Sequence, residues 1–267
     1  MEIKAIACDV DQTLTDESAM LDLHAVEVVR CLEAGGVPVI LVTSREYMTA
    51  GSLSTFMGAC GVVAAEDGTV IGNFWDFFQG PTVLGDCAKI ERGLAVLRNK
   101  LGDQVTIFPW PGRICSACLM RSPTYSAEQG NAILVENEVG ARLLDSGVAY
   151  LLIDADTNKG RGLREAAKLL GIEPENIVAI GDNFNDLDMF AVAGYSIAVG
   201  NAPQAVKDQV DYACHLRFGG GFCEGVRHAL EQFPVPGVYV PFSEDTGPGP
   251  TDQSKQQKLT TKLKEDS

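Results

Sequence analysis

The sequence predicts an α/β fold with a parallel sheet and a small inserted α+β domain. Over residues 1–73, short apolar segments alternate with an amphipathic segment, and a similar alternation returns over residues 156–242. Such alternation is typical of βαβ units, whose strands form a parallel sheet covered by helices. Residues 74–155 carry helix and strand signals without this alternation. We therefore expect them to form a separate module inserted into one core, because 267 residues suffice for a large domain that carries a smaller one.

The core begins with a strand, a helix and a second strand. Residues 3–10 and 37–42 are short apolar runs, which favours buried strands. Between them, residues 24–34 place three apolar side chains on one helical face, and two glycines follow as a helix stop. A third strand is expected at residues 62–65, followed by a turn at residues 66–68.

The inserted module and the second half of the core follow in order. In the module we expect helices at residues 87–101 and 126–138, and strands at residues 105–108, 114–120 and 148–153. In the core we expect strands at residues 177–180 and 195–199, and helices at residues 160–170, 186–193, 202–209 and 222–231. Residues 243–267 have almost no large apolar side chains and are rich in Pro, Gly, Ser and charged residues, so we expect a disordered tail.

Composition and charge narrow the classes of function. The net charge is −15, from 36 acidic and 21 basic residues, which disfavours nucleic acid and anionic membranes as partners. The longest apolar run, residues 37–42, is far too short to cross a bilayer. The N-terminal segment lacks the pattern of a secretory signal, so we expect a cytoplasmic protein with eight reduced cysteines.

Two of these cysteines, Cys115 and Cys118, form a C-x-x-C motif. A zinc site would need a second pair at suitable spacing, and the sequence has none. The motif therefore favours two ordinary thiols over a metal or redox centre.

The strongest chemical signal is the pair Asp9 and Asp11, directly after the first apolar strand. Open α/β sheets bind ligands in the crevice beyond the carboxyl ends of their strands. Two anions crowded there need a cation, and a hard divalent ion such as Mg²⁺ suits carboxylate oxygens. Taken alone, the motif could also be a turn with solvated acids.

A second acidic loop follows the strand at residues 177–180. It places Asp182, Asn185 and Asp186 at another strand end, where they offer further oxygen ligands. A loop rich in Gly, Asp and Asn is common by itself, so this signal gains weight only from the others.

Two further segments offer groups that bind phosphate. Thr43, Ser44 and Arg45 follow the strand at residues 37–42, and Lys159 opens a helix, whose N-terminus attracts anions. Taken singly, the first segment favours a helix N-cap and the second a solvated lysine. Their order along the chain, acidic pair, hydroxyl, lysine and acidic loop, is far more specific than any one of them.

As a set, the four segments resemble the four motifs of haloacid dehalogenase superfamily phosphatases. The position of the insertion is similar to that of the subfamily with a C2-type cap, the Cof-like enzymes, and its short length is similar to the archaeal-type phosphoglycolate phosphatases. The resemblance implies a Rossmann-like catalytic core at residues 1–73 and 156–242 and a specificity cap at residues 74–155. It implies Mg²⁺-dependent hydrolysis of a small phosphorylated metabolite, a sugar phosphate or a phosphoglycolate-like acid. We expect a monomer or homodimer.

The resemblance also implies a role for each motif residue. Asp9 would be the nucleophile that forms an aspartyl-phosphate, and Asp11 the general acid and base. Thr43 and Lys159 would hold the phosphoryl oxygens and neutralise their charge. Ser44, Arg45 and Asn185 would complete the phosphate site. The metal residues would be Asp9, Asp11 through its backbone carbonyl, Asp182 and Asp186, the last near the metal or Lys159.

Two positions depart from the family pattern. Gln12 and Ser44 stand where the family usually has glycine, which permits close backbone approach and unusual dihedral angles. In the cap, Arg113 and Arg121 are candidates to bind a substrate carboxylate, and Trp110 is a candidate lid residue, although surface and packing roles compete with these.

Other functions use the same motifs. A phosphotransferase or mutase would replace water with a second alcohol, and a non-catalytic regulator would bind the ligand without turnover. The intact motif residues favour an enzyme.

Overall fold

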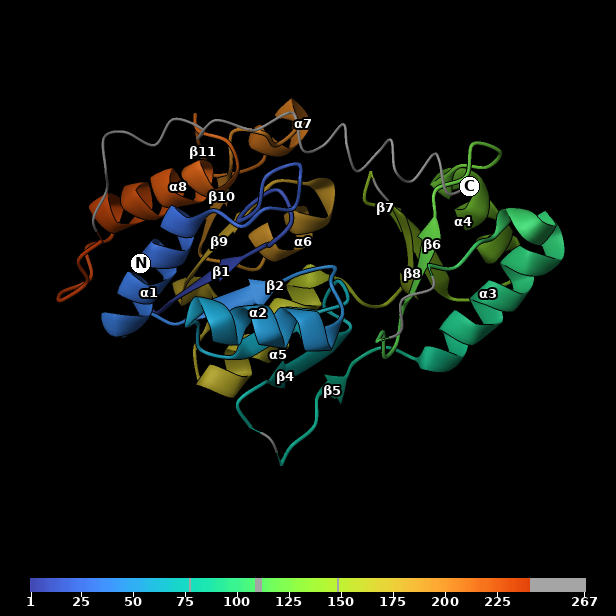
Figure 1. Cartoon of the computed structure of the whole chain (residues 1–267), viewed down its shortest axis with the longest axis horizontal. Helices are drawn as coiled ribbons and strands as arrows, with labels where there is room; N and C mark the ends of the chain where they lie inside the picture. Colours follow the sequence, from blue (N-terminus) through green and yellow to red (C-terminus); the bar gives the residue numbers. More distant parts are fainter. Residues whose placement is uncertain (77, 109–111, 148, 241–267) are drawn as a thin grey trace, which may run out of the picture.

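The computed structural model describes residues 1–76, 78–108, 112–147 and 149–240 (Figure 1). Its larger unit is built on an eight-stranded sheet with the order β11-β10-β9-β1-β2-β3-β4-β5. These strands are β1 (Ala5–Cys8), β2 (Val39–Val42), β3 (Val62–Ala65), β4 (Val70–Asn73), β5 (Thr82–Val83), β9 (Ile177–Gly181), β10 (Tyr195–Ala198) and β11 (Tyr212–Ala213). The fold class predicted from the sequence, a mixed α/β fold with a mostly parallel sheet, is confirmed.

The order of the strands along the chain reverses at β1, in the centre of this sheet. Strand β1 pairs in parallel with β2 on one side and with β9 on the other, and Cys8 is in register with both Leu41 and Ile180. The carboxyl ends of the three strands therefore lie at one edge of the sheet. Open α/β sheets bind their ligands at such a reversal of strand order.

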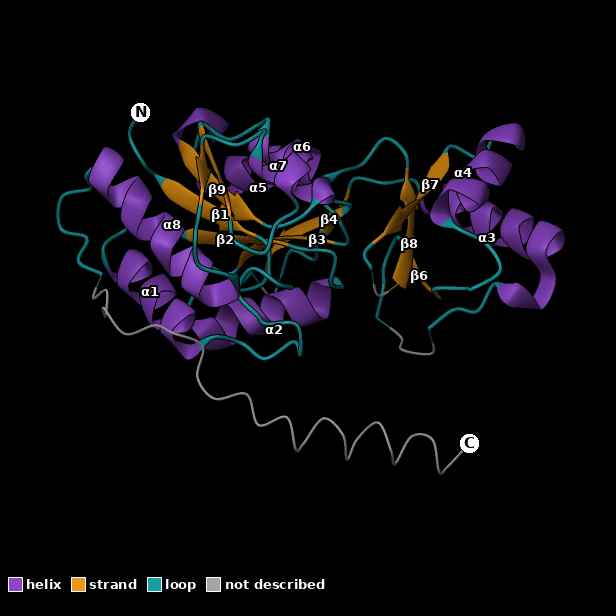
Figure 2. Cartoon of the chain, turned by 90° about the horizontal axis from the view of Figure 1, so that it is seen from above, coloured by secondary structure: helices purple, strands orange, loops and turns teal. Residues whose placement is uncertain are grey.

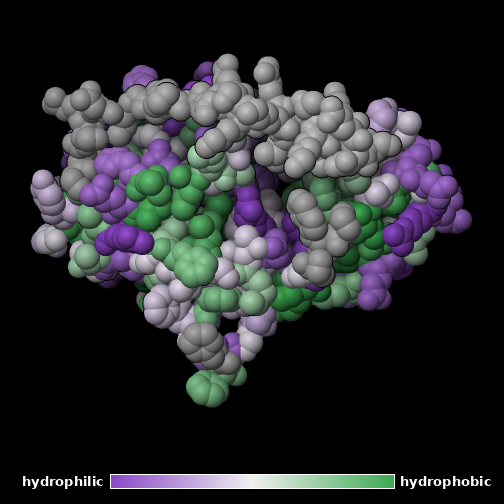
Figure 3. Space-filling view, in the orientation of Figure 1, coloured by the Kyte–Doolittle hydropathy of each residue, from purple (hydrophilic) through white to green (hydrophobic). Residues whose placement is uncertain are grey.

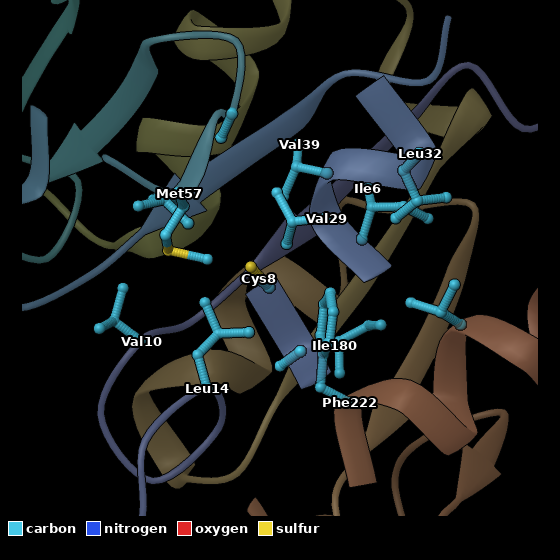
Figure 4. Close-up of a cluster of buried hydrophobic side chains, with 14 of the residues drawn as sticks. Ile6, Cys8, Val10, Leu14, Val29, Leu32, Val39, Met57, Ile180 and Phe222 are labelled. Atoms are coloured by element: carbon cyan, nitrogen blue, oxygen red, sulfur yellow. The ribbon is translucent and has the colours of Figure 1, made fainter. Parts of the chain in front are cut away.

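Helices cover both faces of the sheet (Figure 2). On one face lie α1 (Leu23–Ala34), α2 (Tyr47–Met57) and α8 (Phe218–Gln232), and on the other α5 (Lys159–Leu170), α6 (Leu187–Phe190) and α7 (Gln204–Lys207). Alternate residues of the central strands point to opposite faces, so Ile6 packs with the first group and Ala7 with the second. Figure 4 shows part of the first core, where Cys8, Val29 and Phe222 meet. Burial on both faces explains why these strands are continuous apolar runs.

The smaller unit consists of one sheet layer and one helix layer. Its antiparallel sheet has the order β6-β8-β7, formed by β6 (Ala117–Met120), β7 (Ala141–Asp145) and β8 (Ala149–Asp154). Helices α3 (Cys87–Leu101) and α4 (Ala127–Glu136) pack on the side of this sheet away from the larger unit (Figures 1 and 2). Three short 3-10 helices, at Gly102–Gln104, Pro174–Asn176 and Phe184–Asp186, complete the described elements.

Side-chain caps explain where several helices begin. Asp22 accepts hydrogen bonds from two backbone N–H groups at the start of α1, Asp86 caps α3, and Asn158 caps α5. Ser126 and Gln129 form a reciprocal capping box at α4. Two of these caps, Asp86 and Asn158, lie where the chain enters the smaller unit and returns from it.

Several expectations from the sequence differ from the structure. Helix α2 and strands β4, β5, β7 and β11 were not expected. Because β5 pairs with β4 in the large sheet, residues 82–83 lie with the core and not with the module. The strand expected at residues 105–108 is reduced to one bridge between Ile107 and Leu119. The expected tail at residues 243–267 and the lid candidate Trp110 lie outside the described residues. Within the described ranges, no helix combines the length and apolarity that a membrane span needs.

Candidate active site

The motif residues converge at the carboxyl edge of the large sheet. Asp9 follows β1, Thr43 follows β2, and Asp182 follows β9, while Lys159 is the first residue of α5. The Asp9 N–H donates to the carbonyl of Ile180, which continues the pairing of β1 with β9 up to the site. Parallel pairing thus brings together residues that are more than a hundred positions apart in the chain.

Lys159 is the central cation of the site. Its Nζ lies 2.9 Å from Oδ1 of Asp9 and 2.6 Å from Oδ1 of Asp186, and its side chain is only 1% exposed. Burial lowers the pKa of Lys159, but the carboxylates of Asp186 and Asp9 outweigh this effect and raise the pKa overall. Lys159 is therefore a permanently charged group that is held in place from two sides.

Asp9, Asp182 and Asp186 form a buried acidic cluster in which one carboxylate oxygen of each lies within 4.8 Å of the others. Burial, together with the neighbouring Asp186, raises the pKa of Asp182 to about 7. Burial also raises the pKa of Asp9 well above its usual range. Lys159 alone does not compensate three carboxylates, and hard oxygen ligands at this spacing fit a divalent cation such as Mg²⁺.

Asp186 is already engaged by the protein through both oxygens. Oδ1 accepts from Lys159, and Oδ2 accepts from the backbone N–H groups of Asp182 and Asn183 at 2.8 and 2.9 Å. Asp182 instead accepts one hydrogen bond from the hydroxyl of Thr13 at 3.3 Å. Among the described residues, this difference leaves the Asp182 carboxylate more available to a cation than that of Asp186.

Asp11 and Arg45 form an ion pair at the rim of the site. Nε of Arg45 lies 2.9 Å from Oδ2 of Asp11, and Nη2 lies 2.5 Å from Oδ1. Both side chains are more than a third exposed. The Asp11 carboxylate lies outside the acidic cluster and pairs with the guanidinium of Arg45, the residue that we expect at the phosphate.

Ser44 and Asn185 meet at a buried acid that the sequence marked only as a turn. Oδ1 of Asp67 accepts from the Ser44 hydroxyl and from the Asn185 amide, each at 2.9 Å. Its Oδ2 is buried and has no hydrogen-bond partner among the described residues. Asp67 and Glu66 both have positive φ, a strained conformation that functional sites often contain.

Gly68 completes this turn for a steric reason. A Cβ atom there would lie 2.1 Å from the carbonyl oxygen of Asn158, and its φ is +82°. The glycine lets the turn after β3 press against the start of α5. The close approach holds Lys159 beside the ends of the central strands.

Gln12 departs from the family pattern at a position where the backbone favours glycine. Its φ is +62°, in the left-handed region. Asn201 donates to the Gln12 carbonyl at 2.9 Å, and the Gln12 N–H donates to the Thr15 hydroxyl at 3.1 Å. These two contacts hold the loop after Asp11 in this conformation.

The two candidate cap arginines occupy different places. Arg113 reaches the core, where Nη2 donates to the Ser44 carbonyl at 3.0 Å. Arg121 instead contacts Asp145 and the carbonyl of Gly147 within the smaller unit. Hydrophilic residues gather along the junction between the two units, with apolar surface on either side (Figure 3).

The expectation of eight reduced cysteines is wrong for two of them. Cys87 and Cys115 form a disulfide, because the loop before β6 brings Cys115 to the first turn of α3, with a Cα–Cα distance of 4.9 Å. Cys118, the other member of the C-x-x-C motif, is a free thiol. The 28-residue separation of the pair in the sequence carries no signal that would reveal it.

Comparisons with known proteins agree with this arrangement. The sequence model of the haloacid dehalogenase-like hydrolase family matches residues 6–82 and 135–217. The chain is 34% identical over 224 residues to a phosphoglycolate phosphatase of Archaeoglobus fulgidus, an alignment that covers 84% of this chain and 96% of the relative. It is 35% identical over 228 residues to a phosphoglycolate phosphatase of Methanothermobacter thermautotrophicus, which covers 85% of this chain and 99% of the relative.

Solved structures share the fold. A protein of Thermoplasma acidophilum superposes with a TM-score of 0.73 at 21% identity, covering 85% of this chain and 98% of its own. A haloacid dehalogenase-like hydrolase of Bacteroides thetaiotaomicron gives a TM-score of 0.68 at 18% identity, covering 86% and 99%. Together with the family match, these likenesses confirm the resemblance seen in the motifs. The chain belongs to the haloacid dehalogenase-like hydrolases and is a phosphatase of that family.

Proposed function

We propose that this phosphatase hydrolyses a small phosphorylated carboxylic acid, such as phosphoglycolate, through an aspartyl-phosphate on Asp9. The observation that carries the proposal is the position of Asp9 at the strand end, with its carboxylate 2.9 Å from the buried Lys159. A carboxylate beside a fixed cation can approach a phosphoryl group that its own charge would otherwise repel.

The reaction would proceed in two steps. An oxygen of Asp9 attacks phosphorus, the bond from phosphorus to the substrate oxygen breaks, and Asp11, protonated and released from Arg45 for this step, gives its proton to the departing alcohol. Asp11 then takes a proton from water, which attacks phosphorus and releases phosphate, so that the Asp9 carboxylate is restored. Lys159 and the Thr43 hydroxyl hold the phosphoryl oxygens throughout.

Asp9 and Asp182 would hold Mg²⁺ together with the backbone carbonyl of Asp11. The bound ion would neutralise charge on the phosphoryl oxygens. Asp186 keeps Lys159 oriented, since its two oxygens are engaged by Lys159 and by backbone N–H groups. The position of the Asp11–Arg45 pair at the rim supports a role on the side of the leaving alcohol.

The choice of substrate class rests on two supports. The relatives in Archaeoglobus fulgidus and Methanothermobacter thermautotrophicus are phosphoglycolate phosphatases by name. In addition, Arg113 of the smaller unit lies against Ser44, where a guanidinium can bind a substrate carboxylate. We propose that the smaller unit acts as the cap that sets specificity, and that this cap begins near α3 and not at residue 74.

The experiment is phosphate release from a panel of phosphorylated compounds, with Mg²⁺ and with a chelator in its place. The panel spans phosphoglycolate, phosphoglycerates, sugar phosphates and nucleotides. We expect metal-dependent release that is fastest with phosphoglycolate. Faster release from sugar phosphates would instead favour the second substrate class.

A phosphotransferase and a non-catalytic regulator, which would carry the same motifs, would give different results. Transfer of phosphate to an added sugar in preference to water would identify a phosphotransferase. Tight binding of phosphoglycolate without release of phosphate would identify a regulator and contradict the proposal.

A further inference from the structure

Glu66 joins the two units at the edge of the active site. It lies in the turn after β3, in the larger unit, and its side chain is completely buried. Its carboxylate accepts three hydrogen bonds from one loop of the smaller unit: from the N–H of Ile114 at 2.7 Å, the N–H of Cys115 at 3.1 Å and the hydroxyl of Ser116 at 2.5 Å. A buried carboxylate is costly without donors, so this loop is held to Glu66 by charge-assisted bonds.

Arg113 lies at the start of the same loop. Its Nη1 donates to the Ser116 hydroxyl at 3.0 Å, and its Nη2 donates to the Ser44 carbonyl at 3.0 Å. Ser116 therefore contacts both Glu66 and Arg113, and Ser44 lies between the two motif residues Thr43 and Arg45. The chain of contacts leads from Glu66 through Ser116 to a guanidinium beside the proposed phosphate site.

We propose that Glu66 is a positioning residue that fixes Arg113, and that Arg113 selects substrates with a second negative charge on the alcohol side. The inference rests on the proposed function and deepens it. Among the described residues, Ser116 and Ser44 engage two of the five N–H groups of the guanidinium, so the other groups can donate to a substrate carboxylate. Without Glu66, the loop loses its buried acceptor and Arg113 loses its fixed position.

The same loop is anchored a second time within the smaller unit. The disulfide ties Cys115 to Cys87, in the first turn of α3. Glu66 thus fixes the loop to the core, and the disulfide fixes it to the helix layer. Arg113 can be placed accurately only if both anchors hold, because long side chains on free loops sample many rotamers.

The test compares two substrates of similar size that differ in charge, phosphoglycolate and ethyl phosphate. Wild type, Arg113→Gln, Glu66→Gln and the double variant are assayed for kcat and KM on both. The matched control is Arg121→Gln, because Arg121 is a cap arginine that contacts Asp145 and Gly147 instead of the core. Circular dichroism and thermal unfolding check that each variant folds.

We expect Arg113→Gln to raise KM for phosphoglycolate by about ten- to one-hundred-fold, the range for loss of a hydrogen-bonded charge pair. KM for ethyl phosphate, and kcat for both substrates, should change by less than about threefold, a small effect on this scale. Glu66→Gln should reduce the same preference, and the double variant should resemble Arg113→Gln alone, because both changes remove one interaction. Arg121→Gln should match wild type.

The proposal would be overturned if the effects of Glu66→Gln and Arg113→Gln on substrate preference added up in the double variant. It would also be overturned if either variant lost activity equally on phosphoglycolate and ethyl phosphate. If Glu66→Gln does not fold, Ser116→Ala decides, since it removes only the group that joins Glu66 to Arg113; an unchanged preference in that variant contradicts the proposal. Failure of the proposed function has a different signature, because wild type itself would then release no phosphate from either compound.

Discussion

The side-chain nitrogen of Lys159 lies 2.6 Å from Oδ1 of Asp186, and both side chains are almost completely buried. Lys159 compensates part of the negative charge of three clustered carboxylates. We expect Lys159→Gln to abolish phosphatase activity and to lower the free energy of unfolding by about 3 kcal/mol or more at pH 8, because unpaired buried charges are costly.

The loss of stability in Lys159→Gln should depend on pH. The pKa of Asp182 is raised to about 7, so the folded state binds more protons than the unfolded state between about pH 4 and pH 7. The contribution of Asp182 to the free energy of unfolding therefore falls as pH rises through that window, and it falls more steeply in Lys159→Gln. Urea unfolding in the absence of metal at pH 5 and pH 8 measures this. The control Lys168→Gln alters an exposed pair with Glu165 and should change stability by less than about 0.5 kcal/mol. Equal losses at both pH values would contradict the account.

Gln12 offers a test of backbone strain. Its left-handed φ of +62° costs an L-residue about 1–2 kcal/mol, whereas glycine adopts it freely but loses more entropy on folding. We expect Gln12→Gly to raise the free energy of unfolding by up to about 1 kcal/mol, since the relief of strain exceeds the entropic cost. Gln12→Ala keeps the strain and should give no gain. Thermal unfolding of the three proteins decides, and a stabilised alanine variant would show that strain is not the cause.

Asp154 forms hydrogen bonds with both segments that join the two units, near Asp86 and near Asp156. It accepts from Lys89 at 2.7 Å, from the Asp86 N–H at 2.8 Å and from the Asp156 N–H at 3.0 Å. Burial alone would raise the pKa of Asp154, but these hydrogen bonds lower it overall. Its stabilising effect is therefore present at neutral pH and lost as pH falls through the lowered pKa.

We expect Asp154→Asn to lose about 1–3 kcal/mol of unfolding free energy at pH 7, and less at pH 3, which is below the ordinary pKa of an Asp carboxyl of about 3.9. Denaturant unfolding at both pH values measures the difference from wild type. The matched control is Asp156→Asn, because Asp156 also contacts Lys89 but its side chain is 74% exposed. A difference that persists unchanged in acid would show that the Asp154 charge is not responsible.

The disulfide should stabilise the folded state by lowering the conformational entropy of the unfolded chain. Cys87 and Cys115 are 28 residues apart, and closing a loop of that length is worth about 2–4 kcal/mol. We expect Cys87→Ser and a thiol reductant to lower stability equally, with no further effect of the reductant on the variant. Cys118→Ser should keep the response to reductant, because Cys118 is free. Wild type that unfolds identically with and without reductant would argue against the bond.

The sequence was sufficient for the fold class and for the strand ends that carry the motif residues. Apolar runs before Asp9, Thr43 and Asp182 indicated buried parallel strands, and parallel strands bring their carboxyl ends to one edge. Helix α2 was missed because its segment, Tyr47–Met57, is rich in Ser, Thr and Gly, and Glu46 provides no side-chain cap. Strand β7 was missed because its segment, ARLLD, contains Arg and Asp and is not a continuous apolar run.

Sequence patterns did not predict the contacts between distant segments of the chain. Glu66 was visible only as part of a turn, since its partners include backbone N–H groups that no residue type reveals. The pairing of Arg45 with Asp11 depends on side-chain geometry across two loops. Gln12 was the exception: its departure from glycine was visible in the sequence, and the backbone has the left-handed conformation that glycine favours.

The measurement that tests the central claim most directly is phosphate release from phosphoglycolate by Asp9→Asn in the presence of Mg²⁺. Asparagine keeps the shape of the side chain but removes the nucleophile, so we expect activity to fall by at least about a thousand-fold. Asp16→Asn, a change to a nearby acid that accepts hydrogen bonds from the backbone N–H groups of Ser18 and Met20, should keep wild-type activity. Substantial turnover by folded Asp9→Asn would contradict the assignment of Asp9 as the nucleophile and with it the proposed mechanism.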